Sequence, residues 1–202
     1  MRGINLSPLS VQYANFSLED SIRIHVRTIQ ELIKVFNARV VLIPHVVCDF
    51  NEGDDDLRYL LKVKQAIASK HQGAVNLLET DTGFIGIKKE LIKCDLVIAA
   101  RMHCAINALA AHVPTILVAY SRKGAGMCQY VYGSSDWVVP LYEFVPDTVL
   151  DKVRDLIRQK EQIWAYLAKR IPEIQEAAYG PVKALKEILE NKETLWGKCI
   201  FR

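Results

Sequence analysis

The sequence lacks the features that mark secreted or membrane-spanning chains. Its five cysteines, at positions 48, 94, 104, 128 and 199, form no CxxC pair and are odd in number, so they do not indicate a disulfide framework. Cys94 and Cys104 lie in apolar segments, which suits a reducing cytosol. No apolar run approaches the roughly 20 residues that span a bilayer, and MRGINLSPLS at the N-terminus has no hydrophobic region of signal-peptide length. We therefore expect a cytoplasmic protein without a transmembrane segment.

The sequence also lacks a charge excess and the common nucleotide-binding fingerprints. The 26 Lys and Arg residues nearly balance the 23 Asp and Glu residues, and no five basic residues occur in a row. This composition excludes nucleic acid as an expected partner. The GxGxxG and P-loop patterns are absent. A hydrophobic content of 50% and a mean hydropathy of +0.08 are enough for a sizeable core.

What the sequence does contain is an alternation of short apolar strands and amphipathic helices. Strands are predicted at residues 3–6, 39–44, 74–78, 96–100, 115–119 and 137–139. Helices are predicted at residues 18–36 with Ser17 as N-cap, from Asp54 to about Lys70, and at 84–93, 103–111, 147–169 and 172–191. This alternation predicts an α/β fold, a Rossmann-like doubly wound parallel sheet with helices on both faces. We expect one domain over residues 1–202, with a helical C-terminal tail from about residue 146.

Polar residues follow several of the predicted strands. In an open parallel sheet, ligands bind outside the carboxyl ends of the strands, near the next helix N-termini. The residues at these ends are Asn5, Ser7, His45, Arg101, His103, Tyr120, Ser121, Arg122 and Lys123. Gly124 and Gly126 predict a loop after the fifth strand whose backbone can approach a ligand closely. Cationic groups and helix N–H donors at one edge would suit a small anion such as a phosphate or a carboxylate.

Each of these residues also has an ordinary structural interpretation. Arg101 could pair with a core carboxylate, and His45 or His103 could cap a turn or a helix. The Asp54–Asp56 triplet is interpreted as a helix start, because the helix dipole favours carboxylates there. His25, His71 and His112 are interpreted as surface or helix-end residues. No set of histidines and carboxylates has convincing ligand spacing, so no metal is expected.

Taken together and in order, these segments resemble the polysaccharide pyruvyl transferase family. The residues that carry the resemblance are GINLSP at 3–8, LIPH at 42–45 with the following Asp54–Asp56, CDLVIAARMH at 94–103, Ala105-Ile106-x-Ala108, Val113-Pro114 and Tyr120-Ser121-x-Lys123-x-x-Gly126. The resemblance covers most of residues 1 to about 140.

The resemblance implies transfer of the pyruvyl group of phosphoenolpyruvate to two hydroxyls of a sugar, which yields a ketal and phosphate in the synthesis of cell-surface polysaccharide. No cofactor is implied besides this donor substrate, and the partner substrate is a saccharide acceptor. Arg101 and His103 match the arginine and histidine that hold the donor, and His103 is the expected acid/base catalyst. The remaining substrate-binding residues expected on this basis are Met102 through its backbone amide, Lys123, Ser121, Gly126, His45, Asn5 and Ser7.

The family is similar to two-domain glycosyltransferases of the GT-B kind, whose active site lies between two Rossmann-like halves, and this chain resembles the C-terminal, donor-binding half. In the family, an N-terminal half precedes a GINLSP-like strand and supplies a further donor-binding arginine, and on this resemblance we expect that half to lie outside the present sequence. We expect that half or a partner chain to complete the cleft. Two alternatives remain: the donor-binding half of a nucleotide-sugar glycosyltransferase or epimerase, with Asp136 or Glu143 on the ribose, and a non-catalytic remnant acting as an interaction domain.

Overall fold

Six parallel strands form one sheet that organises the fold. The computed structural model describes residues 1–48, 50–79 and 83–199, with side chains through residue 190. The strands are β1 (Arg2–Asn5), β2 (Val40–Leu42), β3 (Val75–Leu77), β4 (Leu96–Ala99), β5 (Thr115–Ala119) and β6 (Val138–Pro140). Their order is β3-β2-β1-β4-β5-β6, and every neighbouring pair is parallel. This is the doubly wound Rossmann order, so the predicted fold class is confirmed.

The strand order has a reversal between β1 and β4. The chain first winds outward from β1 through β2 to β3, then returns to the far side of β1 and winds outward again through β4, β5 and β6. Right-handed crossovers that run in opposite directions place their helices on opposite faces of the sheet. The carboxyl ends of β1 and β4 therefore flank the crevice in which ligands of such sheets bind.

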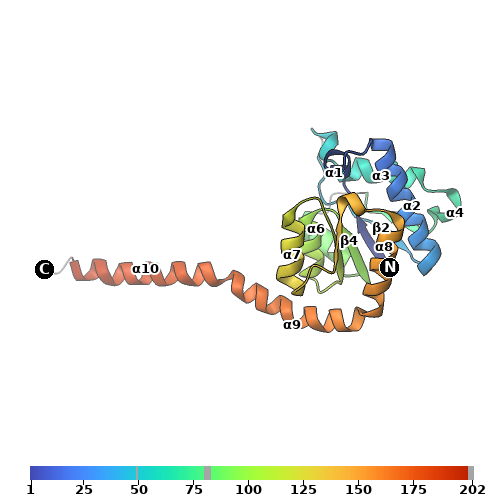
Figure 1. Cartoon of the computed structure of the whole chain (residues 1–202). Coiled ribbons are helices and arrows are strands. Elements are labelled where there is room, and N and C mark those ends of the chain that lie inside the picture. The colour runs from blue at the N-terminus through green and yellow to red at the C-terminus, as the bar shows by residue number, and fades with distance from the viewer. Residues whose placement is uncertain (49, 80–82, 200–202) are drawn as a thin grey trace.

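Helices cover both faces of the sheet, as Figure 1 shows. The longer helices are α2 (Leu18–Phe36), α3 (Asp56–Ala66), α5 (Gly83–Leu91), α6 (Met102–Leu109), α7 (Arg122–Tyr132) and α8 (Pro146–Arg158). Helix α2 packs against α3 and α8, whereas α5 packs against α6, and α7 packs against β5. Strands such as β4, with all four residues buried, are apolar throughout because they are covered on both sides.

The first half of the chain folds largely as predicted. Helix α2 has the expected bounds, and the Ser17 side chain caps it by accepting a hydrogen bond from the backbone N–H of Asp20. The helix predicted from Asp54 to about Lys70 is shorter. A 3₁₀ turn, η1 (Glu52–Asp54), precedes α3, which ends at Ala66, and a separate short helix, α4 (Ser69–Gln72), follows. A short helix that was not predicted, α1 (Leu9–Tyr13), follows β1.

The predicted loop after the fifth strand is wrong, because α7 begins at Arg122, directly after Ser121, and includes both Gly124 and Gly126. Gly124 lets this helix lie flush against β5. A Cβ atom at Gly124 would lie only 2.6 Å from the Cβ atom of Ala119. The glycine thus serves close packing of helix on strand, where a loop with ligand-approaching backbone was expected.

The helical tail is confirmed, but its breaks lie elsewhere than predicted. The tail consists of α8, α9 (Lys160–Ala178) and α10 (Gly180–Cys199). Pro172 lies inside α9, where it was expected to start a helix. The helix continues through this proline because Ile163, Leu167 and Ile171 form a buried stripe at helical spacing, so packing overrides the local cost of proline.

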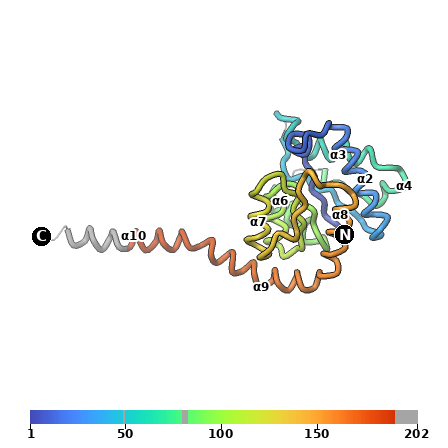
Figure 2. The backbone as a smooth tube through the Cα atoms, viewed as in Figure 1, coloured from blue at the N-terminus to red at the C-terminus, as the bar shows by residue number. Residues whose placement is uncertain are grey.

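Helix α10 extends away from the sheet and its covering helices, as Figures 1 and 2 show. Its apolar residues Val182, Leu185, Ile188 and Leu189 are all exposed. None of the described helices is long and apolar enough to cross a membrane.

Candidate functional site

The site is built around Asn5, the last residue of β1, at the reversal of the strand order. Its Oδ1 accepts a hydrogen bond of 2.8 Å from the backbone N–H of Arg101, which follows β4. Its Nδ2 donates to the carbonyl of Ile43 at 2.9 Å and to Oδ2 of Asp56 at 3.2 Å. Asn5 is fully buried. Its side chain therefore joins the ends of β1, β2 and β4 and the start of α3.

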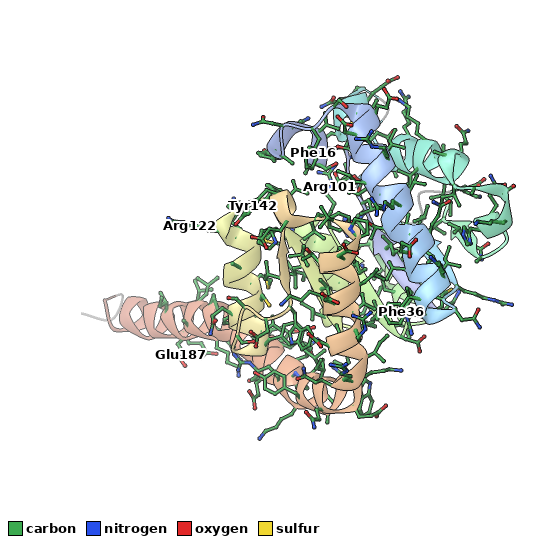
Figure 3. The ribbon with its side chains drawn as sticks, turned by 45° about the vertical axis from the view of Figure 1, so that its right-hand side comes forward. Phe16, Phe36, Arg101, Arg122, Tyr142 and Glu187 are labelled. Carbon is green, nitrogen blue, oxygen red and sulfur yellow. The ribbon has the colours of Figure 1, made fainter. Side chains whose placement is uncertain are left out.

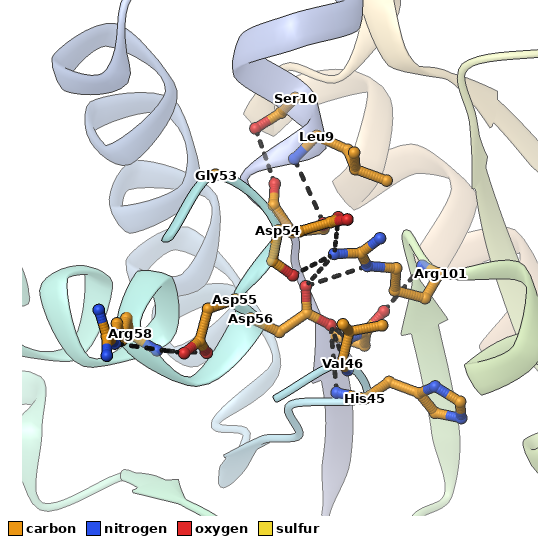
Figure 4. A network of polar contacts seen from close by, with 12 residues as sticks. Leu9, Ser10, His45, Val46, Gly53, Asp54, Asp55, Asp56, Arg58 and Arg101 are labelled. Carbon is orange, nitrogen blue, oxygen red and sulfur yellow. Dashed lines mark hydrogen bonds and ion pairs between the residues drawn. The ribbon is translucent and has the colours of Figure 1, made fainter. Parts of the chain in front are cut away.

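Asp56 is the centre of the polar network drawn in Figure 4. Its Oδ2 accepts hydrogen bonds of 3.1 Å from the backbone N–H groups of His45 and Val46, in addition to the bond from Asn5. Its Oδ1 accepts a bond of 3.0 Å from Nε of Arg101. Asp56 is fully buried, so a carboxylate with this many donors holds its partners in one fixed arrangement.

Arg101 is held by two carboxylates. Its Nη2 donates to the backbone carbonyl of Asp54 at 2.7 Å and to Oδ1 of Asp54 at 2.9 Å, and it pairs with Oδ1 of Asp56 at 3.0 Å. The Arg101 side chain is 13% exposed, whereas that of Asp54 is 42% exposed. Burial opposes the charged form, but Asp56 and Asp54 raise the pKa of Arg101 above its ordinary value. The guanidinium thus stays charged and oriented.

His45 and His103 approach the same region from β2 and α6. The pKa of His45 is lowered because burial disfavours the imidazolium; Asp56 opposes this effect, and the nearby His103 and Arg101 add to it. His45 is therefore neutral near pH 7. Its Nε2 is buried and has no hydrogen-bond partner among the described residues. His103 lies in the first turn of α6 and is exposed.

Two helices begin beside these residues without a side-chain cap. Within the described ranges, no side chain caps the N-terminus of α6 after Arg101 or that of α7 after Ser121. By contrast, Ser17 caps α2 and Asp55 caps α3. Uncapped N–H groups and the positive end of the helix dipole favour an anion.

A small hollow lies between the starts of α6 and α7. Its volume is about 30 Å³, and the predicted site residues that line it are Met102, Ser121 and Lys123. A space of this size holds about one water molecule. A larger ligand would therefore have to lie outside the hollow. Figure 3 shows Arg101, Arg122 and Tyr142 at this same end of the molecule, with Phe36 toward the other.

The structure thus brings Arg101, His45 and His103 together, with Met102, Ser121 and Lys123 beside them. The other three predicted site residues are placed differently. Asn5 and Ser7 are buried and bonded within the chain; Ser7 Oγ accepts from the backbone N–H of Leu9 at 3.3 Å. Gly126 lies within α7, where an added Cβ would meet nothing within 4 Å. The substrate-binding roles of all three remain predictions.

Several features of the site were not predicted from the sequence. Asp54 and Asp56 were interpreted only as a helix start, although Arg101 had been recognised as able to pair with a core carboxylate. His25, interpreted as a surface or helix-end residue, is buried, and its Nδ1 lies 2.6 Å from the hydroxyl of Tyr59. Asp136 precedes β6 and so lies at the opposite, amino-terminal edge of the sheet from the candidate site.

Comparison with known proteins identifies the family of the chain. The family model described as polysaccharide pyruvyl transferase matches residues 11–122. No curated protein and no solved structure matches the chain. The matched segment runs from α1 to the start of α7 and contains His45, the Asp54–Asp56 triplet and Arg101 to His103. Because the match covers more than half of the 202 residues, the chain belongs to the polysaccharide pyruvyl transferase family.

Proposed function

We propose that this chain binds phosphoenolpyruvate at the carboxyl edge of its sheet and takes part in transferring the pyruvyl group to sugar hydroxyls as a ketal. Membership of the family supports a transferase acting in polysaccharide synthesis. The observation that carries the proposal is the convergence of Arg101, His45 and His103 beside the uncapped start of α6.

The donor has two anionic groups, and the site offers several groups that bind anions. Asp56 and Asp54 engage Nε and Nη2 of the Arg101 guanidinium, so its Nη1 is the nitrogen that can donate to a phosphate or a carboxylate. The backbone N–H of Met102, at the start of α6, and the Ser121 start of α7 add donors that favour negative charge. Lys123, beside the same hollow, supplies a second and more mobile cation.

The reaction needs proton transfers that histidines can supply. Protonation of the methylene carbon of phosphoenolpyruvate creates a cationic carbon that a first sugar hydroxyl attacks, and that hydroxyl loses its proton. Phosphate then leaves with its electron pair, and a second hydroxyl closes the ketal and loses its proton. We assign His103 to one of the proton transfers, for which a positioned group contributes about 10²–10⁴-fold. For His45 to bind a sugar hydroxyl, its ring would have to turn, because its Nε2 is buried in this structure.

This half of the site is open on one side. The hollow beside Met102 and Lys123 measures only about 30 Å³, so a donor would lie outside it, where water would screen the charges that act on the donor. Another domain or a partner chain that covers this edge would complete the cleft. We therefore expect this chain alone to bind the donor and to turn it over slowly.

Calorimetric titration with phosphoenolpyruvate and, separately, with UDP-glucose tests the proposal. We expect phosphoenolpyruvate to bind more tightly, and Lys123→Met to weaken that binding. With the completed cleft, His103→Ala should reduce phosphate release in the presence of acceptor by about 10²–10⁴-fold.

Each contrary result points elsewhere. Tighter binding of UDP-glucose would favour a nucleotide-sugar enzyme, and binding of neither ligand would favour a non-catalytic interaction domain. Turnover by His103→Ala within a few-fold of the wild type would remove the acid/base role from His103.

A further inference from the structure

Two exposed tyrosines stack on each other at the carboxyl edge of the sheet. Tyr13 ends α1, and Tyr120 follows β5. Their ring centroids are 4.5 Å apart, with an angle of 19° between the ring planes. The two residues are nevertheless 57% and 41% exposed. Each ring thus packs part of its surface against the other ring, and the rest of its surface is exposed to solvent.

The stacked pair lies near the end of β4. Strands β1 and β5 both neighbour β4 but do not pair with each other. Tyr120 shares a hollow with Ala100, which directly follows β4, and with Leu9, the first residue of α1. The stacked pair therefore lies beside the end of β4. Tyr120 also lines the hollow that contains Met102 and Lys123. The pair consequently lies on the rim of the proposed donor site.

The chemistry of this pair differs from that of the donor site. Arg101, Lys123 and the helix starts are suited to an anion, whereas the stacked rings are neutral and present flat faces with negative electrostatic potential. The C–H groups on one face of a pyranose ring are apolar and slightly positive, and they complement such a face. Tyrosine hydroxyls can also exchange hydrogen bonds with sugar hydroxyls. A saccharide is the ligand that matches both properties.

We propose that Tyr13 and Tyr120 form the platform on which a pyranose ring of the acceptor stacks. This assignment rests on the proposed function, because the platform is useful only if it presents sugar hydroxyls to a donor held near Arg101. The larger hollow of about 500 Å³, lined by Trp137, Tyr166 and polar residues, lies toward the amino-terminal edge of the sheet and could not present a hydroxyl there.

Saturation-transfer NMR with methyl glycosides of glucose, galactose, mannose, N-acetylglucosamine and N-acetylmannosamine tests the platform. We expect at least one glycoside to receive saturation at its ring C–H protons. Tyr13→Ala and Tyr120→Ala should each weaken its binding about 2- to 10-fold. Tyr13→Phe and Tyr120→Phe should retain most of it, and unchanged unfolding midpoints of the two alanine variants in urea should show that their loss is not one of folding. Tyr179→Ala removes a tyrosine of similar exposure, 61%, on the tail and should change nothing.

Absence of transfer to every glycoside, or full binding by both alanine variants, would overturn the platform. Calorimetric binding of phosphoenolpyruvate to the same variants separates the two proposals. Retained donor binding without saccharide binding refutes the platform alone. If the protein binds a saccharide through the two tyrosines but does not bind phosphoenolpyruvate, the platform is supported and the proposal that phosphoenolpyruvate is the donor is refuted.

Discussion

Replacement of Asp56 by alanine should destabilise the protein severely. The substitution removes the acceptor for Nε and Nη2 of Arg101, for Nδ2 of Asn5 and for the backbone N–H groups of His45 and Val46. All of these donors lie around a fully buried carboxylate, so water cannot replace it without opening the sheet edge.

The expected loss is about 3–5 kcal/mol, the cost of removing one partner of a buried ion pair. Domains of this size are stable by about 5–15 kcal/mol, so the loss is a large fraction of the total. Asp54→Ala is the matched control. It removes the other carboxylate on Arg101, but that side chain is 42% exposed, and the expected loss is at most about 1 kcal/mol.

Equilibrium unfolding in urea, followed by circular dichroism, measures both variants. For an m-value of about 2 kcal/mol/M, Asp56→Ala should lower the midpoint by about 2 M and Asp54→Ala by less than about 0.5 M. Replacing both Asp56 with Asn and Arg101 with Met should cost less than the two single changes added together, because the partners are coupled. If Asp56→Ala were within about 1 kcal/mol of the wild type, the buried network would not be the support described here.

Further predictions concern pH, packing and donor binding. Burial lowers the pKa of His25 to about 3. In the unfolded state the His25 imidazole binds a proton near pH 6.5, so the wild type should lose about 2 kcal/mol of stability between pH 7.5 and pH 5. Urea unfolding at the two pH values should show that His25→Gln lacks this loss. Gly124→Ala should destabilise the protein by about 1–3 kcal/mol in the same assay because its Cβ would clash with Ala119. Gly126→Ala, in open space two residues along the helix, should instead stabilise it by about 0.5–1 kcal/mol. Asp54→Ala should bind phosphoenolpyruvate about fivefold more tightly in calorimetry, because it removes a negative charge from Arg101; unchanged or weaker binding would contradict a donor site at this guanidinium.

The sequence was sufficient to predict the sheet and to place the candidate residues at its carboxyl edge. Apolar runs such as Leu96 to Ala99 have the composition of strands covered on both faces, and parallel strands end at a common edge. Residues that directly follow strands, such as His45 and Arg101, could therefore be assigned to one place. The same reasoning could not tell which of these side chains face a ligand and which, like that of Asn5, make all their hydrogen bonds within the chain.

The parts that were missed depend on contacts between distant segments. Nothing local distinguishes the role of Asp56 from that of Asp55, since both begin the same helix; only the return of the chain to β4 places Arg101 beside one of them. From the sequence alone, Gly124 indicates a loop. Its actual role, close packing of α7 against β5, depends on a contact that only the folded structure shows. Pro172 indicates a helix start until the buried stripe of α9 is seen to run through it.

The reversal of the strand order has a consequence for how the chain acquires this site. Asp56 belongs to the part of the sheet that winds outward through β2 and β3, whereas its counter-ion Arg101 arrives only with β4 on the other side of β1. A partly folded species with only the first three strands assembled would confine a carboxylate without its cation, which is unfavourable. When the second set of strands docks, Arg101 pairs with this carboxylate and neutralises its charge. We therefore expect the Asp56–Arg101 pair to couple the two sets of strands into one cooperative folding transition.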